Sequence, residues 1–168
     1  MKNLIPILVD ELTNEIATTR KFIHIIPTDK YSWKPHPKSM SLGQLAVHIA
    51  EIASWPAISL NTDFLDFAVK PYEPSLFKDN NDLLTILNKG ELSSIQTLES
   101  STEEHLDHKW ELRYGDKILL SLTKYGMVRH SIDQMIHHRA QLGVFLRLLD
   151  IPIPGSYGPS ADDNNEFS

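Results

Sequence analysis

The sequence has no cysteine among its 168 residues. Disulfide bonds, thiolate metal sites and cysteine nucleophiles are therefore all excluded. The redox state of the protein's compartment is left open, because a chain without thiols gives no sign of it.

An excess of basic residues is also missing. The chain has 16 Lys and Arg against 22 Asp and Glu, which gives a formal net charge of −6 at pH 7. No run of like charge provides a local basic patch either. Proteins that bind nucleic-acid backbones need such a patch to displace counterions. We therefore expect no nucleic-acid partner.

Long apolar runs are absent as well. The first residues, MKNLIPILVDELTNE, hold a short apolar patch that Pro6, Asp10 and Glu11 interrupt. A signal peptide or a membrane span needs a longer uninterrupted stretch. We therefore expect a cytoplasmic protein with no membrane partner.

Four segments carry an apolar period typical of helices. The first covers about residues 5–26 and is stopped by Pro27. The second begins at Ser41, because Ser41 and Gln44 have the spacing of a capping box. Pro56 should kink or end that second helix, since proline removes a backbone donor and clashes with the preceding turn.

The later segments complete the expected architecture. A third helix should follow the polar cluster at residues 80–82, with Gly90 as its weak point, and a fourth should run over about residues 122–149. Between them, WELRYGDKILLSL predicts an irregular or short hairpin segment. Four helices with long connecting loops predict an all-α four-helix bundle over residues 1–150. The Pro/Gly-rich turn and the polar tail, residues 151–168, should belong to the same domain, with a loosely ordered end.

Two adjacent histidines, His137 and His138, stand out in the last helix. Neighbouring residues differ by about 100° around a helix axis, so only one of the two can face the core. The apolar stripe passes through His138, which leaves His137 facing outward. Residues four apart share a face, so Gln134 lies one turn before His138 on the inward side.

His48 lies on the apolar face of the second helix, between Leu45 and Ile52. An imidazole there costs desolvation free energy unless it finds a partner. Together with Gln134 and His138, it could hold one metal ion, because imidazole nitrogens bind such ions at about 2.0–2.1 Å. A core histidine bonded to its own neighbour explains each position equally well, so the residues alone leave both interpretations open.

Three further residues are candidates for supporting such a site or for binding substrate. Glu51, three residues after His48, could orient that imidazole as a hydrogen-bond acceptor, or could be solvated or paired with a lysine. Arg139 could anchor an anionic substrate or form a structural salt bridge between helices. His137 is retained because it adjoins His138.

Three segments resemble the DinB-like superfamily: WKPHPKS, MSLGQLAVHIAE and HHRAQLGVFLRLLDIPIPG. The resemblance spans nearly the whole chain and is most specific over its last forty or so residues. It implies a four-helix bundle with up-down-down-up topology. It also implies a divalent metal bound by one histidine of the second helix and a His-x-x-x-His pair of the fourth. By position, the implied ligands are His48, Gln134 and His138.

Gln134 is where the chain departs from that family pattern, since it replaces the first histidine of the pair. A carboxamide oxygen is neutral and a weaker ligand for transition metals than imidazole. We therefore expect zinc, nickel, manganese or iron to bind weakly, with water completing the coordination, or not to bind.

The resemblance further implies chemistry in which a metal binds a low-molecular-weight thiol cosubstrate and lowers its pKa. We accordingly expect a metal-dependent enzyme, a thiol S-transferase or a relative of one, acting on a small-molecule substrate, with no catalytic residue assigned. The alternative is a non-catalytic bundle that binds a small ligand or a protein partner and carries a degraded metal site. We expect a homodimer.

Overall fold

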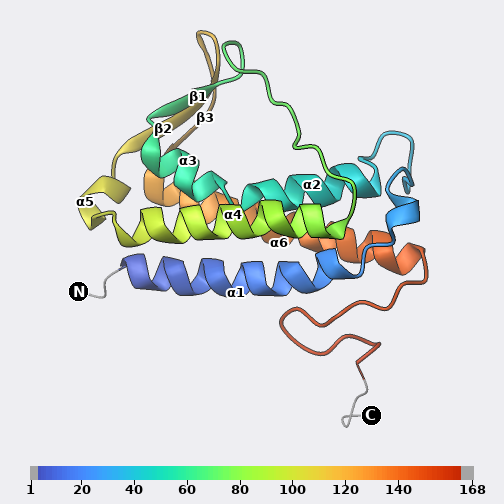
Figure 1. The fold of residues 1–168 in the computed structure, drawn as a ribbon. Coiled ribbons are helices and arrows are strands. Elements are labelled where there is room, and N and C mark those ends of the chain that lie inside the picture. The colour runs from blue at the N-terminus through green and yellow to red at the C-terminus, as the bar shows by residue number, and fades with distance from the viewer. Residues whose placement is uncertain (1–3, 164–168) are drawn as a thin grey trace.

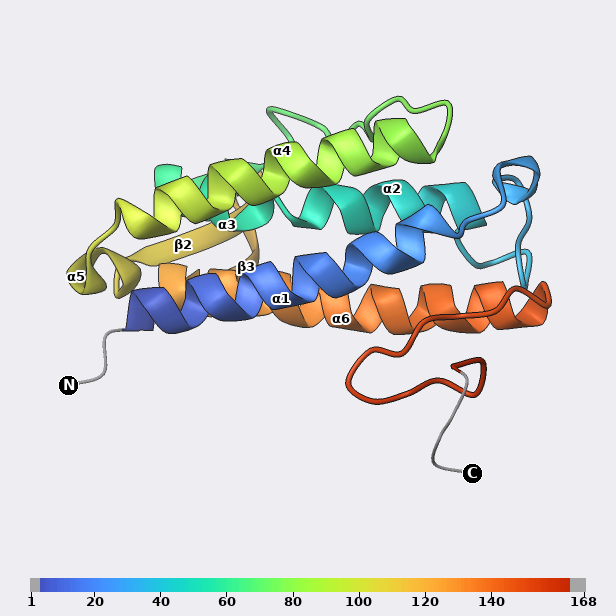
Figure 2. The ribbon, with the colours of Figure 1, turned by 60° about the horizontal axis from the view of Figure 1, so that its bottom comes forward.

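The computed structural model describes residues 4–163. Four long helical segments lie side by side and form the body of the molecule (Figures 1 and 2). They are α1 (Leu4–His24), α2 (Leu42–Ile52) continued by α3 (Trp55–Asn61), α4 (Asn80–Glu99) and α6 (Lys124–Leu148). A 3-10 turn, η1 (Thr28–Lys30), and a single helical turn, α5 (Glu103–Leu106), occupy two of the connections.

The helices enclose one apolar core. Helix α1 packs against α4 and α6, and the α2–α3 segment packs against the same two helices from the other side. In Figure 1 the chain runs from left to right along α1 and α6, and from right to left along α2, α3 and α4. Because α2 and α6 are neighbours, side chains on their facing surfaces can meet. Leu12, Ile16, Leu45, Leu87 and Leu142 are among the fully buried core residues.

The start of α2 is set locally, as predicted. Ser41 is its N-cap residue, and the Ser41 and Gln44 side chains each accept the other's backbone N–H, so the capping box is complete. Pro56 also acts as predicted, because α2 ends at Ile52 and α3 begins one residue before Pro56. These two signals fix the position of the α2–α3 segment along the bundle.

Gly90 in α4 has a different role from the weak point that its helix propensity predicts. A Cβ atom at Gly90 would lie 2.8 Å from the Ser54 backbone nitrogen and 2.9 Å from Ala53. The absence of a side chain lets α4 approach the backbone between α2 and α3 closely. Asp79 caps α4 by accepting from Asn81 and Asp82, so the helix begins within the predicted polar cluster.

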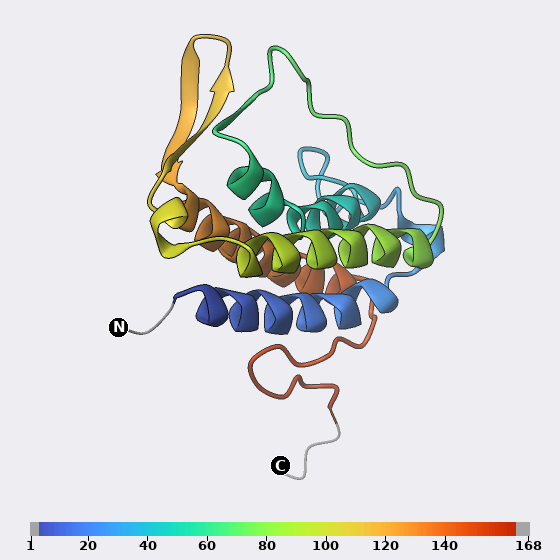
Figure 3. The same cartoon turned by 60° about the vertical axis from the view of Figure 1, so that its left-hand side comes forward.

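The fold is mainly helical but not all-α, because it includes a three-stranded sheet in the order β1-β2-β3. The predicted hairpin is confirmed as β2 (Lys109–Tyr114) and β3 (Lys117–Thr123), with Gly115 in the left-handed conformation at its turn. The sequence prediction missed β1 (Phe64–Asp66), which pairs with β2 in parallel. The hairpin and the segment after β1 both project from the α2–α3 side of the bundle (Figure 3).

The chain after α6 folds back along the bundle, and residues 164–168 lie outside the described residues. Asp162 binds the Arg147 guanidinium and accepts from the Ile153 backbone N–H at 2.9 Å. These contacts join Asp162 to α6 and to the start of the C-terminal segment. Within residues 4–163, no helix has the length and apolar character required to cross a bilayer.

Candidate metal centre

His48 and His138 meet between α2 and α6. Their ring centroids are 4.7 Å apart and the ring planes are inclined by 76°. An ion at about 2.0–2.1 Å from one nitrogen of each ring would allow centroids up to about 6 Å apart. Both side chains are half-buried. The two rings are therefore close enough to share one ion.

The two imidazoles differ in their hydrogen bonds. His138 Nδ1 lies 2.9 Å from Gln141 Oε1, one turn further along α6. A carbonyl oxygen can only accept, so Nδ1 carries the proton and Nε2 keeps its lone pair. Within residues 4–163, the His48 ring makes no hydrogen bond, and its partners are aromatic rings. At least one nitrogen of each imidazole is therefore free to bind a ligand.

Burial keeps both imidazoles in the neutral form. Desolvation lowers the pKa of His48 below its usual value, and the nearby His138 lowers it further, while Glu51 acts in the opposite direction. Desolvation also lowers the pKa of His138, and the hydrogen bond that His138 donates to Gln141 opposes this shift. A metal ligand must be deprotonated, so both shifts favour metal binding at neutral pH.

Gln134 is half-buried on α6, four residues before His138. That spacing puts the two side chains on one face of the helix, with Cβ atoms about 5–6 Å apart. In the described part of the chain the Gln134 carboxamide makes no hydrogen bond, and no group of three His, Asp or Glu side chains could hold a metal ion. The available ligand set is therefore two imidazoles and one carboxamide.

Two more aromatic side chains lie next to the imidazole pair, Trp55 beside His48 and His130 beside Trp55. Neither was among the predicted site residues. The Trp55 ring contacts the His48 ring at a centroid distance of 5.6 Å and lies nearly parallel to His130 at 6.5 Å. The sequence holds a signal for both: Trp55 is seven residues after His48, and His130 is eight before His138. Each spacing is about two helical turns, so each pair shares a face.

Glu51 does not bond to the His48 ring. Its carboxylate accepts from the Tyr72 hydroxyl at 2.6 Å and from the Ser75 backbone N–H and hydroxyl at 2.7 and 2.6 Å. Burial and the Glu51 carboxylate raise the pKa of Tyr72, which keeps this donor protonated. Glu51 therefore anchors the exposed segment between β1 and α4 to the helix that carries His48.

Arg139 lies away from the imidazole pair. Its side chain is 2% exposed, and its guanidinium lies 2.6 Å from the Glu15 carboxylate of α1. It also donates to the Glu15 carbonyl, the Thr19 hydroxyl and the Tyr157 hydroxyl. All of these contacts join α6 to α1 and to the C-terminal segment, so the structural salt bridge is the arrangement present.

His137 is exposed, as the 100° rotation from His138 requires. Its Nε2 lies 3.1 Å from Gln141 Nε2, and its ring centroid lies 5.0 Å from that of His138. His137 therefore reaches the candidate centre through Gln141 instead of facing His48.

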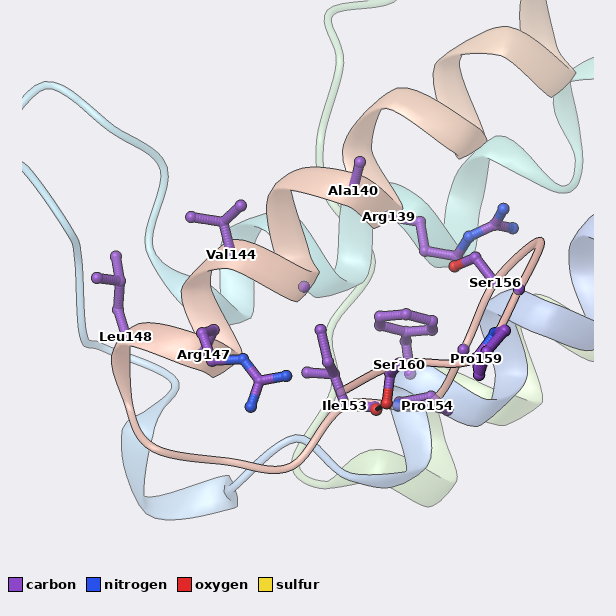
Figure 4. A pocket seen from close by; sticks show the side chains of 14 residues that line it. Arg139, Ala140, Val144, Arg147, Leu148, Ile153, Pro154, Ser156, Pro159 and Ser160 are labelled. Carbon is purple, nitrogen blue, oxygen red and sulfur yellow. Dashed lines mark hydrogen bonds between the residues drawn. The ribbon is translucent and has the colours of Figure 1, made fainter. Parts of the chain in front are cut away.

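A groove in the described surface lies elsewhere. It lies between α6 and the C-terminal segment, has a volume of about 420 Å³, and is bordered by Ala140, Val144, Ile153 and Ser160 among others (Figure 4). None of its lining residues comes from α2 or α3. It is therefore separate from the imidazole pair, and its lining is mostly apolar.

A comparison with family models identifies the family of the chain. The model of the DinB family matches residues 1–166, nearly the entire chain. The chain belongs to the DinB family. This result confirms the resemblance seen in the three sequence segments.

Individual relatives match most of the chain. The Bacillus subtilis protein YjoA is 28% identical over 145 residues, covering 81% of this chain and 80% of YjoA. The crystal structure of YjoA, a DinB-like protein, superimposes with a TM-score of 0.68 at 22% identity, covering 89% of this chain and 96% of that one. YfiT from Bacillus subtilis superimposes with a TM-score of 0.69 at 12% identity, covering 90% and 91%. YfiT is described as a probable metal-dependent hydrolase with an unusual four-helix bundle topology. These structural likenesses show the shared fold.

Proposed function

We propose that this DinB-family protein is an enzyme that binds a divalent metal ion between α2 and α6. The ligands are His48 and His138, with Gln134 as a weaker third ligand. The observation that carries the proposal is the pair of neutral imidazoles from separate helices, with centroids 4.7 Å apart. The description of YfiT as a probable metal-dependent hydrolase supports it.

The residues present fit a divalent ion of the zinc, nickel, manganese or iron class. Two imidazoles and a carboxamide are all neutral donors, so the ion keeps its full charge at the site. Three protein ligands leave coordination positions for water or substrate. The affinity is expected to be lower than that of a three-histidine site, because the carboxamide is the weakest of the three donors.

When bound, the ion would supply Lewis acidity, which lowers the pKa of a coordinated water or thiol. The protein's own side chains hold and enclose the place where the ion would bind. Gln141 keeps the His138 Nε2 lone pair free, and Trp55 packs against His48 and excludes water from that side of its ring. Glu51 holds the segment around Tyr72 beside α2, the helix that carries His48.

Our more specific proposal is transfer to or from a low-molecular-weight thiol. It rests on the family resemblance and on the lack of cysteine, because a nucleophilic sulfur would have to arrive with a cosubstrate. We also propose a small-molecule substrate, a cytoplasmic location and a homodimer, which remain predictions from the sequence.

Titration calorimetry with Zn²⁺, Ni²⁺, Mn²⁺ and Fe²⁺ tests the metal proposal. The wild-type protein should bind one ion per chain, and His138→Ala should lose measurable binding. His24→Ala is the matched control, because His24 is an exposed histidine at the end of α1. The metal affinity of His24→Ala should equal that of the wild type. Absence of binding by the wild type to all four ions would remove the proposal.

A second candidate function has its own observation in favour. Residues 4–163 contain no trio of acidic or histidine side chains that could hold a metal. This favours a degraded site in a bundle that binds a small ligand or a protein partner without catalysis. Gln134→His separates the two functions. If the wild type is an enzyme with a weak site, Gln134→His should tighten metal binding by at least about tenfold; if the site is degraded, only the variant should bind.

A further inference from the structure

Gln141 lies between the two adjacent histidines of α6. Its carboxamide oxygen is 2.9 Å from His138 Nδ1, and its nitrogen is 3.1 Å from His137 Nε2. The spacings of three and four residues put all three side chains on neighbouring positions of one helix surface. One side chain therefore contacts both imidazoles through opposite ends of its amide.

These contacts determine which nitrogen of His138 carries the proton. The amide oxygen has only lone pairs, so it requires a donor at His138 Nδ1. A neutral imidazole has one N–H, so Nε2 is then left as an acceptor. The orientation of a metal-binding histidine depends on the hydrogen bond that its other nitrogen makes.

The contact with His137 agrees with this orientation of the amide. The Gln141 nitrogen can only donate, so His137 Nε2 accepts from it. With its nitrogen held at the exposed His137, the amide presents its oxygen to His138. Rotation of the amide by 180° would place a donor against Nδ1 and would require the opposite tautomer of both histidines.

We infer that Gln141 is a positioning residue, which holds His138 in the Nδ1–H tautomer and so keeps the Nε2 lone pair available for a ligand. The use of that lone pair for metal binding rests on the proposed function above. The tautomer is a property of the metal-free chain and can be measured separately.

Long-range nitrogen–proton NMR of the ¹⁵N-labelled, metal-free protein at pH 8 measures the tautomer. His138 is assigned from the signals that His138→Ala removes. The wild type should show His138 with the proton on Nδ1. Gln141→Leu should move it to the Nε2–H form that predominates in free histidine, and Gln141→Glu should keep the Nδ1–H form, because a carboxylate still accepts.

Gln96→Leu is the matched control, since Gln96 is an exposed glutamine on α4. It should leave the His138 signals unchanged. A wild-type His138 with its proton on Nε2, or a tautomer unchanged in Gln141→Leu, would overturn the inference.

Metal titration then tests the consequence. Gln141→Leu should weaken binding by about 10–100-fold, the usual effect of removing an outer hydrogen-bond partner of a ligating histidine, and Gln141→Glu should restore it. An Nδ1–H tautomer in a wild type that binds no metal would refute the proposed function and leave the positioning role intact. Equal affinities for wild type and Gln141→Leu would refute the link between tautomer and binding.

Discussion

Two pairs of histidines lie at nearly the same ring separation, but their surroundings differ. The His48 and His138 centroids are 4.7 Å apart, and those of His105 and His108 are 5.2 Å apart. His105 Nε2 lies 2.8 Å from the Leu60 carbonyl at the end of α3. His48 has no hydrogen bond within residues 4–163. Ring separation alone therefore does not identify a ligand-binding pair, and the groups that surround each pair must be compared as well.

The end of the bundle around His105 is a polar cluster whose members stabilise one another. The buried Lys124 ammonium donates to the same Leu60 carbonyl at 3.1 Å and lies 3.3 Å from the Asp63 carboxylate. The last carbonyls of a helix lack intrahelical donors. His105 and Lys124 therefore supply hydrogen bonds to a carbonyl at the C-terminal end of α3. His48 and His138 satisfy no such backbone group.

The largest expected effect concerns a buried polar group that is fully paired. Arg139→Met should lower the free energy of unfolding by about 3–5 kcal/mol, because it leaves the Glu15 carboxylate, in a residue 8% exposed, without its counter-charge. Urea denaturation measures the loss. Metal affinity should not change in the fraction that folds, because Arg139 faces α1. A loss below about 1 kcal/mol would mean that the pair contributes little.

A smaller effect compares the two half-buried histidines directly. His105→Phe should cost about 1 kcal/mol, since it removes a hydrogen bond to the Leu60 carbonyl. His48→Phe should cost less or stabilise the fold, because it removes a desolvated imidazole that has no hydrogen bond. Denaturation of the two variants side by side checks the order. A larger loss for His48→Phe would contradict the distinction between the pairs.

The pH dependence of stability should be a smaller effect and should come from the imidazole pair. Burial lowers the pKa of His48 and His138 in the folded state, while the unfolded chain titrates near about 6.5. As pH falls below that value, the unfolded state takes up protons that the folded state does not, so stability decreases. The decrease stops below the folded-state pKa values.

The double variant His48→Phe/His138→Phe is the control for this dependence. Its free energy of unfolding should fall less than that of the wild type between pH 7 and pH 5. Equal slopes for the two proteins, measured by denaturant titration at several pH values, would show that the imidazoles are not held neutral by the fold.

The sequence predicted those parts of the molecule that local patterns determine. The capping box at Ser41 and the break at Pro56 depend on a few neighbouring residues, and the convergence of His48 with His138 follows from helix periodicity once α2 and α6 are neighbours. Strand β1 has only three residues and depends on its pairing with β2, so no local pattern predicts it.

The other differences also depend on contacts between distant segments. Glu51 contacts Tyr72 and Ser75 across a long connection whose path the sequence does not specify. Gly90 is required because α4 comes close to Ala53 and Ser54, which is a property of packing and not of helix propensity. Gln141 is the exception, because its spacing from His137 and His138 is visible in the sequence, whereas its contacts with both rings are seen only in the structure.

Anomalous diffraction from crystals soaked separately in zinc, nickel and manganese salts tests the central claim most directly. We predict one strong peak bonded to nitrogens of His48 and His138, with the Gln134 carboxamide beside it, and none at the similarly spaced His105 and His108. Peaks at the second pair only, or no peak between α2 and α6 with any of the three metals, would contradict the claim that His48 and His138 form a metal centre.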